Sequence, residues 1–173
     1  MSIKVYDTNL VSEDMFAQVV HLPYFYTRVD VPPTQSQPEL DLAGMYWTHQ
    51  FYNYCPIDDP KDYQSPGLHG SDNPLWTDVL TYLEAICPDM PPRDECYSAY
   101  INVLKYNDNP GIHCDAPYHV EDNKTVLVYL NPEWNPNWGG ETIFYDDKLE
   151  AQRIVTPKPG RIVIFDGRIP HTG

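Results

Sequence analysis

The sequence has few basic residues and no long hydrophobic run. Lysine and arginine together number 11, against 25 aspartates and glutamates, so the formal net charge is -14. A surface with this charge repels phosphate groups, and we expect no unaided binding to nucleic acid or to an anionic membrane. No apolar stretch approaches the roughly 18 residues of a membrane span, and the N-terminus does not resemble a secretion signal. We therefore expect a soluble, cytoplasmic protein, for which a neutral or basic substrate is easier to accept than an acidic one. Its oligomeric state cannot be inferred.

Cysteine is also scarce, and its spacing excludes a disulfide framework. Cys55, Cys87, Cys96 and Cys114 form no Cys-x-x-Cys pair. Without a secretory context, we expect reduced thiols, with a bridge between Cys87 and Cys96 as the less favoured alternative.

Proline and tyrosine, in contrast, are abundant, with 18 and 14 copies, a composition that favours strands and irregular loops. The length of 173 residues suits a single domain over residues 1–173. Residues 1–97 are expected to form a helical and loop support region, with a short helix over residues 12–21 and long ordered loops over residues 30–74, pinned by aromatic side chains. A firmer helix is predicted from Pro74, capped by Asp72 or Asn73.

The second half changes character. We expect strands at residues 100–106, 125–130, 141–145, 154–156 and 161–166. Lys158-Pro159-Gly160 is typical of a tight turn between the last two. Short strands at this spacing indicate a sandwich or a barrel over residues 98–173.

The segment Gly111-Ile112-His113-Cys114-Asp115 is the sharpest chemical feature. Side chains alternate along an extended segment, so His113 and Asp115 share a face while Cys114 points away. With a distant histidine, such a pair forms the facial triad of non-haem iron oxygenases, and His171 is the candidate. Taken singly, these histidines are more often structural. A zinc site using His113, Cys114, His119 and His171 is a weaker alternative, because paired Cys or His spacing is lacking.

The order of further motifs strengthens the iron hypothesis. From residue 98 onward these are a strand ending in Tyr106, His113-Cys114-Asp115, Thr125-Val126-Leu127-Val128-Tyr129-Leu130 with Asn131, Trp134, Trp138-Gly139-Gly140-Glu141-Thr142, Pro157-Lys158-Pro159-Gly160, the strand to Phe165, and Pro170-His171. In order and spacing, this segment resembles the 2-oxoglutarate/Fe(II)-dependent oxygenase superfamily, and within it the prolyl 4-hydroxylase-like branch. Residues 1–97 add nothing specific to the resemblance.

The resemblance implies a mainly β fold with N-terminal helices (α+β), built as a double-stranded β-helix (a cupin-like jelly roll). It implies Fe(II), 2-oxoglutarate and O2, with ascorbate as a candidate further cofactor. His113, Asp115 and His171 would be the metal ligands and catalytic residues. Tyr129, Tyr106 and Leu127 would line the cosubstrate pocket, although both tyrosines also suit a core position with satisfied hydroxyls.

One departure concerns the basic residue that the family usually places shortly after the distal histidine, where it pairs with the far carboxylate of 2-oxoglutarate. That position lies beyond Gly173. We expect residues 98–173 to lack the closing strand of the β-helix, with the cation supplied by a segment outside this sequence. The internal alternatives are Lys105, Lys124, Arg161 and Arg168.

The predicted activity is therefore hydroxylation of a C–H bond, with release of succinate and CO2, and the favoured substrate is a prolyl residue in a peptide or protein. Hydroxylation of a free amino acid or another small molecule is the alternative. So is a non-catalytic jelly-roll module that binds a metal or ligand.

Overall fold

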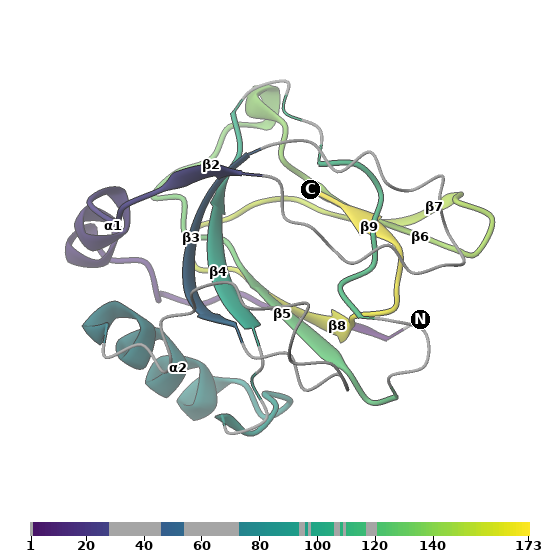
Figure 1. Cartoon of the computed structure of the whole chain (residues 1–173). Helices are drawn as coiled ribbons and strands as arrows, with labels where there is room; N and C mark the ends of the chain where they lie inside the picture. The colour runs from purple at the N-terminus through teal and green to yellow at the C-terminus, as the bar shows by residue number, and fades with distance from the viewer. Residues whose placement is uncertain are drawn as a thin grey trace, which may run out of the picture.

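The computed structural model describes residues 2–27, 46–53, 73–93, 96, 98–105, 108, 110–116 and 121–173. Within these ranges the chain is mostly antiparallel sheet with two α-helices, an arrangement consistent with an oxygenase jelly roll. The elements run β1 (Ile3–Tyr6), α1 (Glu13–Val20), β2 (Phe25–Thr27), β3 (Tyr46–Asn53), α2 (Pro74–Ile86), β4 (Ser98–Val103), β5 (Lys124–Val128), η2 (Pro136–Trp138), β6 (Thr142–Tyr145), β7 (Ala151–Val155), β8 (Ile162–Asp166) and β9 (His171–Thr172), as Figure 1 shows. In the described part of the chain, no helix is both long and apolar enough to cross a membrane.

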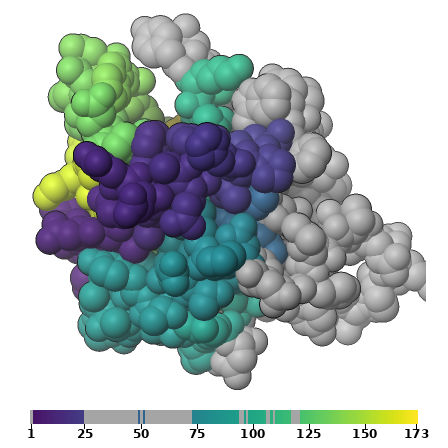
Figure 2. Space-filling model, turned by 90° about the vertical axis from the view of Figure 1, so that its left-hand side faces the viewer, coloured from purple at the N-terminus to yellow at the C-terminus, as the bar shows by residue number. Residues whose placement is uncertain are grey.

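Both helices begin where local sequence predicts. The Ser12 hydroxyl accepts a hydrogen bond from the backbone N–H of Met15 and caps α1. The Asn73 side chain accepts one from the N–H of Leu75, and proline occupies the first turn of α2. These caps satisfy N–H groups that a helix start leaves without an intrahelical partner. The two helices lie next to each other on one outer face of the molecule (Figure 2).

The strands form three antiparallel sheets, in the orders β1-β8-β5, β2-β3-β4 and β7-β6-β9. Strand β8 is the centre of the first sheet and is apolar on both faces. Ile162 and Ile164 point to one face and Val163 and Phe165 to the other, and all four are at most 3% exposed. Because side chains alternate along a strand, β8 contributes to two separate cores.

The first core joins β8 to the helices and to the sheet β2-β3-β4. Its buried members are Val19, Phe51, Leu75, Val79, Leu83, Cys87, Ala99, Ile162 and Ile164. The second core lies between the sheets β1-β8-β5 and β7-β6-β9, and contains Tyr129, Phe144, Val155, Val163 and Phe165. The molecule is thus layered around the sheet β1-β8-β5, which we call the central sheet. The helices lie on one side of it and the sheet β7-β6-β9 lies on the other (Figure 1).

The expectation that residues 1–97 supply only helices and loops is wrong. Strand β1 pairs with β8 along its whole length, from Ile3 opposite Phe165 to Tyr6 opposite Ile162. Residues 46–53 form β3 and pair with β4, where a loop had been expected. Strand formation depends strongly on pairing partners, which for β1 lie more than a hundred residues away in sequence. The rest of the predicted loop region, residues 30–45 and 54–72, lies outside the described residues.

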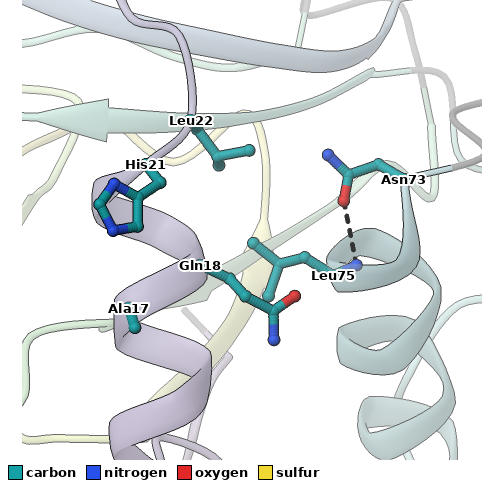
Figure 3. Close-up of a pocket in the computed structure, with 6 residues that line it drawn as sticks. All are labelled: Ala17, Gln18, His21, Leu22, Asn73 and Leu75. Atoms are coloured by element: carbon teal, nitrogen blue, oxygen red, sulfur yellow. Dashed lines mark hydrogen bonds between the residues drawn. The ribbon is translucent and has the colours of Figure 1, made fainter.

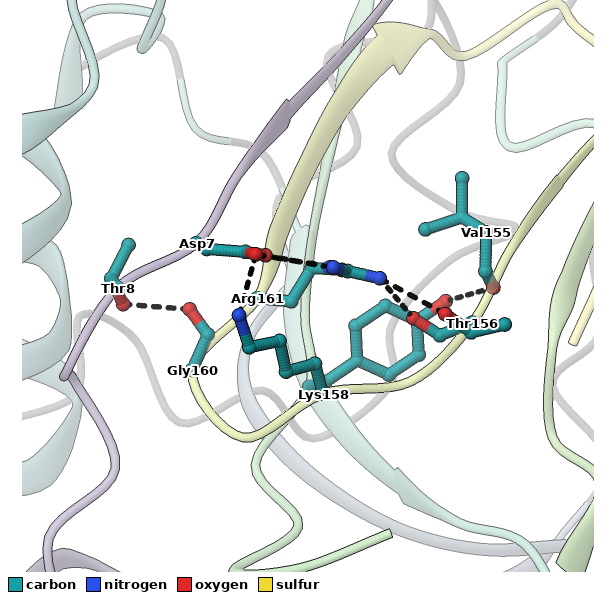
Figure 4. A network of polar contacts seen from close by, with 8 residues as sticks. Asp7, Thr8, Val155, Thr156, Lys158, Gly160 and Arg161 are labelled. Carbon is teal, nitrogen blue, oxygen red and sulfur yellow. Dashed lines mark hydrogen bonds and ion pairs between the residues drawn. The ribbon is translucent and has the colours of Figure 1, made fainter. Parts of the chain in front are cut away.

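The predicted turn at Lys158-Pro159-Gly160 is confirmed. The N–H of Arg161 donates to the carbonyl of Lys158 over 2.9 Å, and Gly160 has a φ of 71°. A type II turn requires a positive φ at this position, which favours glycine. The segment after β1 holds the turn in place, because the Thr8 hydroxyl donates to the carbonyl of Gly160 over 2.6 Å (Figure 4).

The predicted thiol state is confirmed where the structure describes it. Cys87, Cys96 and Cys114 are free cysteines, so the alternative bridge between Cys87 and Cys96 is not formed. Cys55 lies outside the described residues.

Candidate metal centre

His113 and His171 are held opposite each other by the backbone. The N–H of each donates to the carbonyl of the other over 2.9 Å, in an antiparallel bridge. Directly opposed residues of this kind project their side chains to the same side. The centroids of the two imidazole rings are accordingly 4.5 Å apart. His171 also pairs with Phe144 of β6, which ties the pair to the second sheet.

Asp115 joins the two histidines because it follows His113 by two residues. Its backbone N–H donates to the carbonyl of Gly167 over 2.8 Å. The carboxylate oxygen Oδ1 is 3.5 Å from Nε2 of His113, and Oδ2 is 3.4 Å from Nε2 of His171. One potential ligand atom from each residue lies within 4.8 Å of the others. The structure therefore brings together the three residues that the sequence predicts to meet.

Cys114 is not a member of this cluster. Its thiol donates to the backbone carbonyl of Arg168 over 3.3 Å. His119, the other residue of the zinc alternative, lies outside the described residues. The cluster of two imidazoles and one carboxylate thus has the composition of a facial triad rather than of a cysteine-containing structural zinc site.

Backbone carbonyls set the orientation of both imidazole rings. Nδ1 of His113 is 3.2 Å from the carbonyl oxygen of Gly111, and Nδ1 of His171 is 2.9 Å from that of Ile169. A carbonyl can only accept a hydrogen bond, so Nδ1 of each ring carries the proton. In the neutral form of such a ring Nε2 keeps its lone pair, and in both histidines Nε2 faces Asp115. Histidines that bind a metal through one ring nitrogen usually have the other nitrogen, here Nδ1, hydrogen-bonded to a carbonyl or carboxylate in this way.

His171 is the most enclosed of the three side chains. Its side chain is 9% exposed, and the ring packs edge-on against Phe165 at a centroid distance of 4.9 Å. Burial lowers the pKa of His171, the nearby Asp115 partly opposes this, and His113 adds to the lowering. The folded protein therefore favours the neutral imidazole, which is the form that binds a metal.

Residues 101–173 match the family model of the 2OG-Fe(II) oxygenase superfamily. The matched segment contains all three residues of the cluster and supports an oxygenase domain in this part of the chain. The family implies Fe(II), 2-oxoglutarate and O2, and the two histidines and one aspartate fit the iron. Comparison with curated proteins and with solved structures gives no significant match.

Of the three residues predicted to line the 2-oxoglutarate pocket, two are described. Leu127 and Tyr129 both pack into the second core, so they share a face of the chain as expected. The Tyr129 hydroxyl lies 2.6 Å from the Thr142 hydroxyl and donates to the carbonyl of Val155 over 3.3 Å. Burial raises the pKa of Tyr129, so the phenol remains a neutral hydrogen-bond donor. Tyr106 lies outside the described residues, and the cosubstrate role of all three stays a prediction.

Among the basic residues considered for the far carboxylate of 2-oxoglutarate, Arg161 lies opposite Tyr129, whose backbone N–H donates to the carbonyl of Arg161 over 2.9 Å. Its guanidinium donates to both carboxylate oxygens of Asp7 and to the carbonyl and hydroxyl of Thr156 (Figure 4). The Asp7 carboxylate raises the pKa of Arg161, and a smaller effect comes from Tyr129. Arg168 is instead paired with Asp166 over 2.7 Å.

A hollow of about 340 Å³ between α1 and α2 is separate from the cluster. It is lined by Ala17, Gln18, His21, Leu22, Asn73 and Leu75 (Figure 3). Asn73 is already engaged in capping α2. His21 is the one titratable group in this lining, so the hollow lacks the convergent ligands that mark the metal centre.

Two contributors to the centre were missed by sequence reasoning. Thr125 donates a hydrogen bond to Asp115, and the carbonyl of Gly167 accepts from the N–H groups of both Asp115 and Ala116. Thr125 precedes Leu127 and Tyr129 by even intervals, so strand alternation could have placed it on the same face. Gly167 gives no comparable signal, because its contribution depends on tertiary contact.

Proposed function

We propose that the chain is an Fe(II)- and 2-oxoglutarate-dependent dioxygenase that hydroxylates a C–H bond, with a prolyl residue of a peptide or protein as the favoured substrate. The observation that carries this proposal is the cluster of His113, Asp115 and His171 inside the segment that matches the superfamily. Three ligands from one side leave the other positions around a metal open for a cosubstrate.

The residues of the centre have separable tasks. His113 and His171 present Nε2 as the ligand atom, because their Nδ1 atoms are bonded to carbonyls. The Asp115 carboxylate supplies negative charge to a dication. Phe144 and Phe165 cover the His171 ring and keep water from it. When bound, Fe(II) with 2-oxoglutarate and O2 supplies the oxidising chemistry, which releases succinate and CO2 and places a hydroxyl group on the substrate.

The substrate class is inferred from the resemblance and from the charge of the chain. A prolyl residue follows from the resemblance to the prolyl 4-hydroxylase-like branch. The net charge of -14 favours a neutral or basic substrate and disfavours nucleic acid. A free amino acid or other small molecule is the competing class.

The test is succinate release by the Fe(II)-loaded protein with 2-oxoglutarate and a panel of proline-containing peptides and free amino acids, with product mass as a second readout. We expect a mass gain of one oxygen on a prolyl peptide, in step with succinate. Hydroxylation of a free amino acid alone would replace the substrate class and keep the reaction.

Two histidine variants separate the metal centre from general damage. His171→Ala should lose bound Fe(II) and all succinate release, whereas His21→Ala changes an exposed histidine at the end of α1 and should retain both. Succinate release that persists in His171→Ala would contradict the proposal. Fe(II) binding by the wild-type protein with no succinate release on any substrate would favour a non-catalytic binding module.

A further inference from the structure

Thr125 contacts the carboxylate of the metal centre directly. Its hydroxyl donates to Oδ2 of Asp115 over 2.7 Å. Thr125 lies on β5 and pairs with Phe165 of β8, the residue whose ring packs against His171. The hydroxyl therefore comes from the central sheet, whereas Asp115 belongs to the separate segment that carries His113.

The backbone of Asp115 and its carboxylate are fixed by different groups. The carbonyl of Gly167 accepts from the N–H groups of Asp115 and Ala116 and holds the main chain. The carboxylate can still rotate about the Cβ–Cγ bond, for which the torsional preference is broad. Oδ1 and Oδ2 lie at similar distances from the two histidines, 3.5 and 3.4 Å. The Thr125 hydrogen bond makes the two oxygens different, because it occupies Oδ2 and leaves Oδ1 with both lone pairs.

The chain approaches itself closely at this point. A Cβ atom added to Gly167 would lie 3.2 Å from the Thr125 hydroxyl oxygen, 3.1 Å from Cβ of Ala116 and 2.5 Å from Oδ1 of Asn123. Only glycine leaves room for such an approach. The packing of Gly167 between the Asp115 segment and β5 thus keeps the hydroxyl within reach of the carboxylate.

We propose that Thr125 is a positioning residue of the metal centre, whose hydroxyl holds Oδ2 of Asp115 so that Oδ1 is presented to the metal. The inference rests on the proposed function, in which His113, Asp115 and His171 bind Fe(II). Hydrogen bonds to ligating carboxylates orient them, and loss of such a partner commonly weakens metal affinity by about ten- to a hundred-fold.

Four proteins test this role by calorimetric titration with Mn(II), a redox-inert probe for the iron position. Thr125→Val keeps the shape of the side chain and removes the donor. Thr125→Ser and Thr125→Ala both remove the methyl group and differ only in the hydroxyl. We expect the Val and Ala variants to bind Mn(II) at least about ten-fold more weakly than wild type, and the Ser variant to retain most of the affinity.

Thermal unfolding of the metal-free proteins separates positioning from stability. A purely structural role would lower the melting temperature of the Ser and Ala variants without separating their Mn(II) affinities. Equal affinities for these two variants would overturn the role of Thr125 while leaving the metal site intact, and the pair decides the question even where the Val variant does not fold. Failure of the wild-type protein to bind Mn(II) would overturn the metal site itself, and with it this inference.

Discussion

At the scale of single residues, the alternation of side chains along a short extended segment decides which groups meet at the centre. His113 and Asp115 converge with His171, whereas the Cys114 thiol donates to the carbonyl of Arg168. This much follows from residue spacing. The partner histidine had to be chosen from motif order, because the bridge between His113 and His171 is a tertiary contact.

Cys114→Ser should retain Fe(II) binding. The serine hydroxyl can donate to the same carbonyl of Arg168, and no ligand atom is removed from the cluster. Metal content measured on the purified variant, next to His113→Ala as the variant expected to lose iron, provides the check. A folded Cys114→Ser protein without iron would show that the sulfur is a ligand, and would revive the zinc hypothesis.

At the scale of elements, helix starts that depend on nearby residues could be predicted from the sequence, whereas strands that depend on long-range pairing could not. The caps Ser12 and Asn73 act within three residues, so the starts of α1 and α2 could be found from sequence. The aromatic anchoring expected in residues 30–74 is confirmed at Phe51, which is buried and stacks on Trp76 of α2. That this residue belongs to a strand was missed, because β3 is defined by its pairing with β4 rather than by alternation of apolar and polar residues.

At the same scale, ion pairs join the segment after β1 to the turn before β8, and they predict how the stability of the fold changes in acid. Asp7 accepts hydrogen bonds from Arg161 and Lys158, each over 2.7 Å, and these hold its pKa at about 2, below the ordinary 3.8. A lowered carboxyl pKa stabilises the fold fully above the unfolded pKa, and the stabilisation is lost as pH falls through the folded one. Asp7→Asn should therefore be less stable than wild type at neutral pH, and the difference should shrink between pH 3.8 and about 2.

Urea denaturation from pH 7 to pH 2 gives the free energy of unfolding of Asp7→Asn and of wild type. Titration of the other carboxylates affects both proteins alike, so it cancels in the difference between them. Asp147→Asn, a change at an exposed aspartate between β6 and β7, is the matched control and should differ less from wild type. A difference between Asp7→Asn and wild type that stays constant down to pH 2 would show that Asp7 does not act through its charge.

At the scale of the whole molecule, one strand serves both cores. Ile162 and Ile164 of β8 belong to the core under the helices, and Val163 and Phe165 belong to the core between the sheets. Phe165 also contacts His171, so the packing that stabilises the fold continues to the metal centre. The family match begins at residue 101, yet β8 is flanked by β1 from the extreme N-terminal part of the described chain. The matched segment is therefore completed by residues that carry no family signal.

Removing residues 2–6 should consequently destabilise the whole domain, although these residues lie outside the family match. The deletion takes away the partner of β8 along one edge, and with it the apolar side chains of Ile3, Val5 and Tyr6, which pack against the two cores. If each contributes about half the value of a fully buried side chain, the free energy of unfolding falls by about 3 kcal/mol. The exposed edge of β8 would also offer unpaired backbone groups to other chains, so we expect more aggregation.

Urea denaturation gives the change in unfolding free energy, and Mn(II) titration at the same temperature reports how much of the metal centre survives. Deletion of Ser2 alone is the control, because Ser2 is exposed and precedes the first paired residue.

The sharper comparison is a chain of residues 98–173, which contains all three candidate ligands and the whole matched segment but lacks β1, both helices and the strands β2 and β3. We expect it not to unfold cooperatively and to bind Mn(II) weakly, since Ile162 and Ile164 would lose the core that covers them. Cooperative unfolding of residues 98–173 with full Mn(II) affinity would mean that the C-terminal sheets are self-sufficient, and that β1 is an accessory to the fold rather than a part of it.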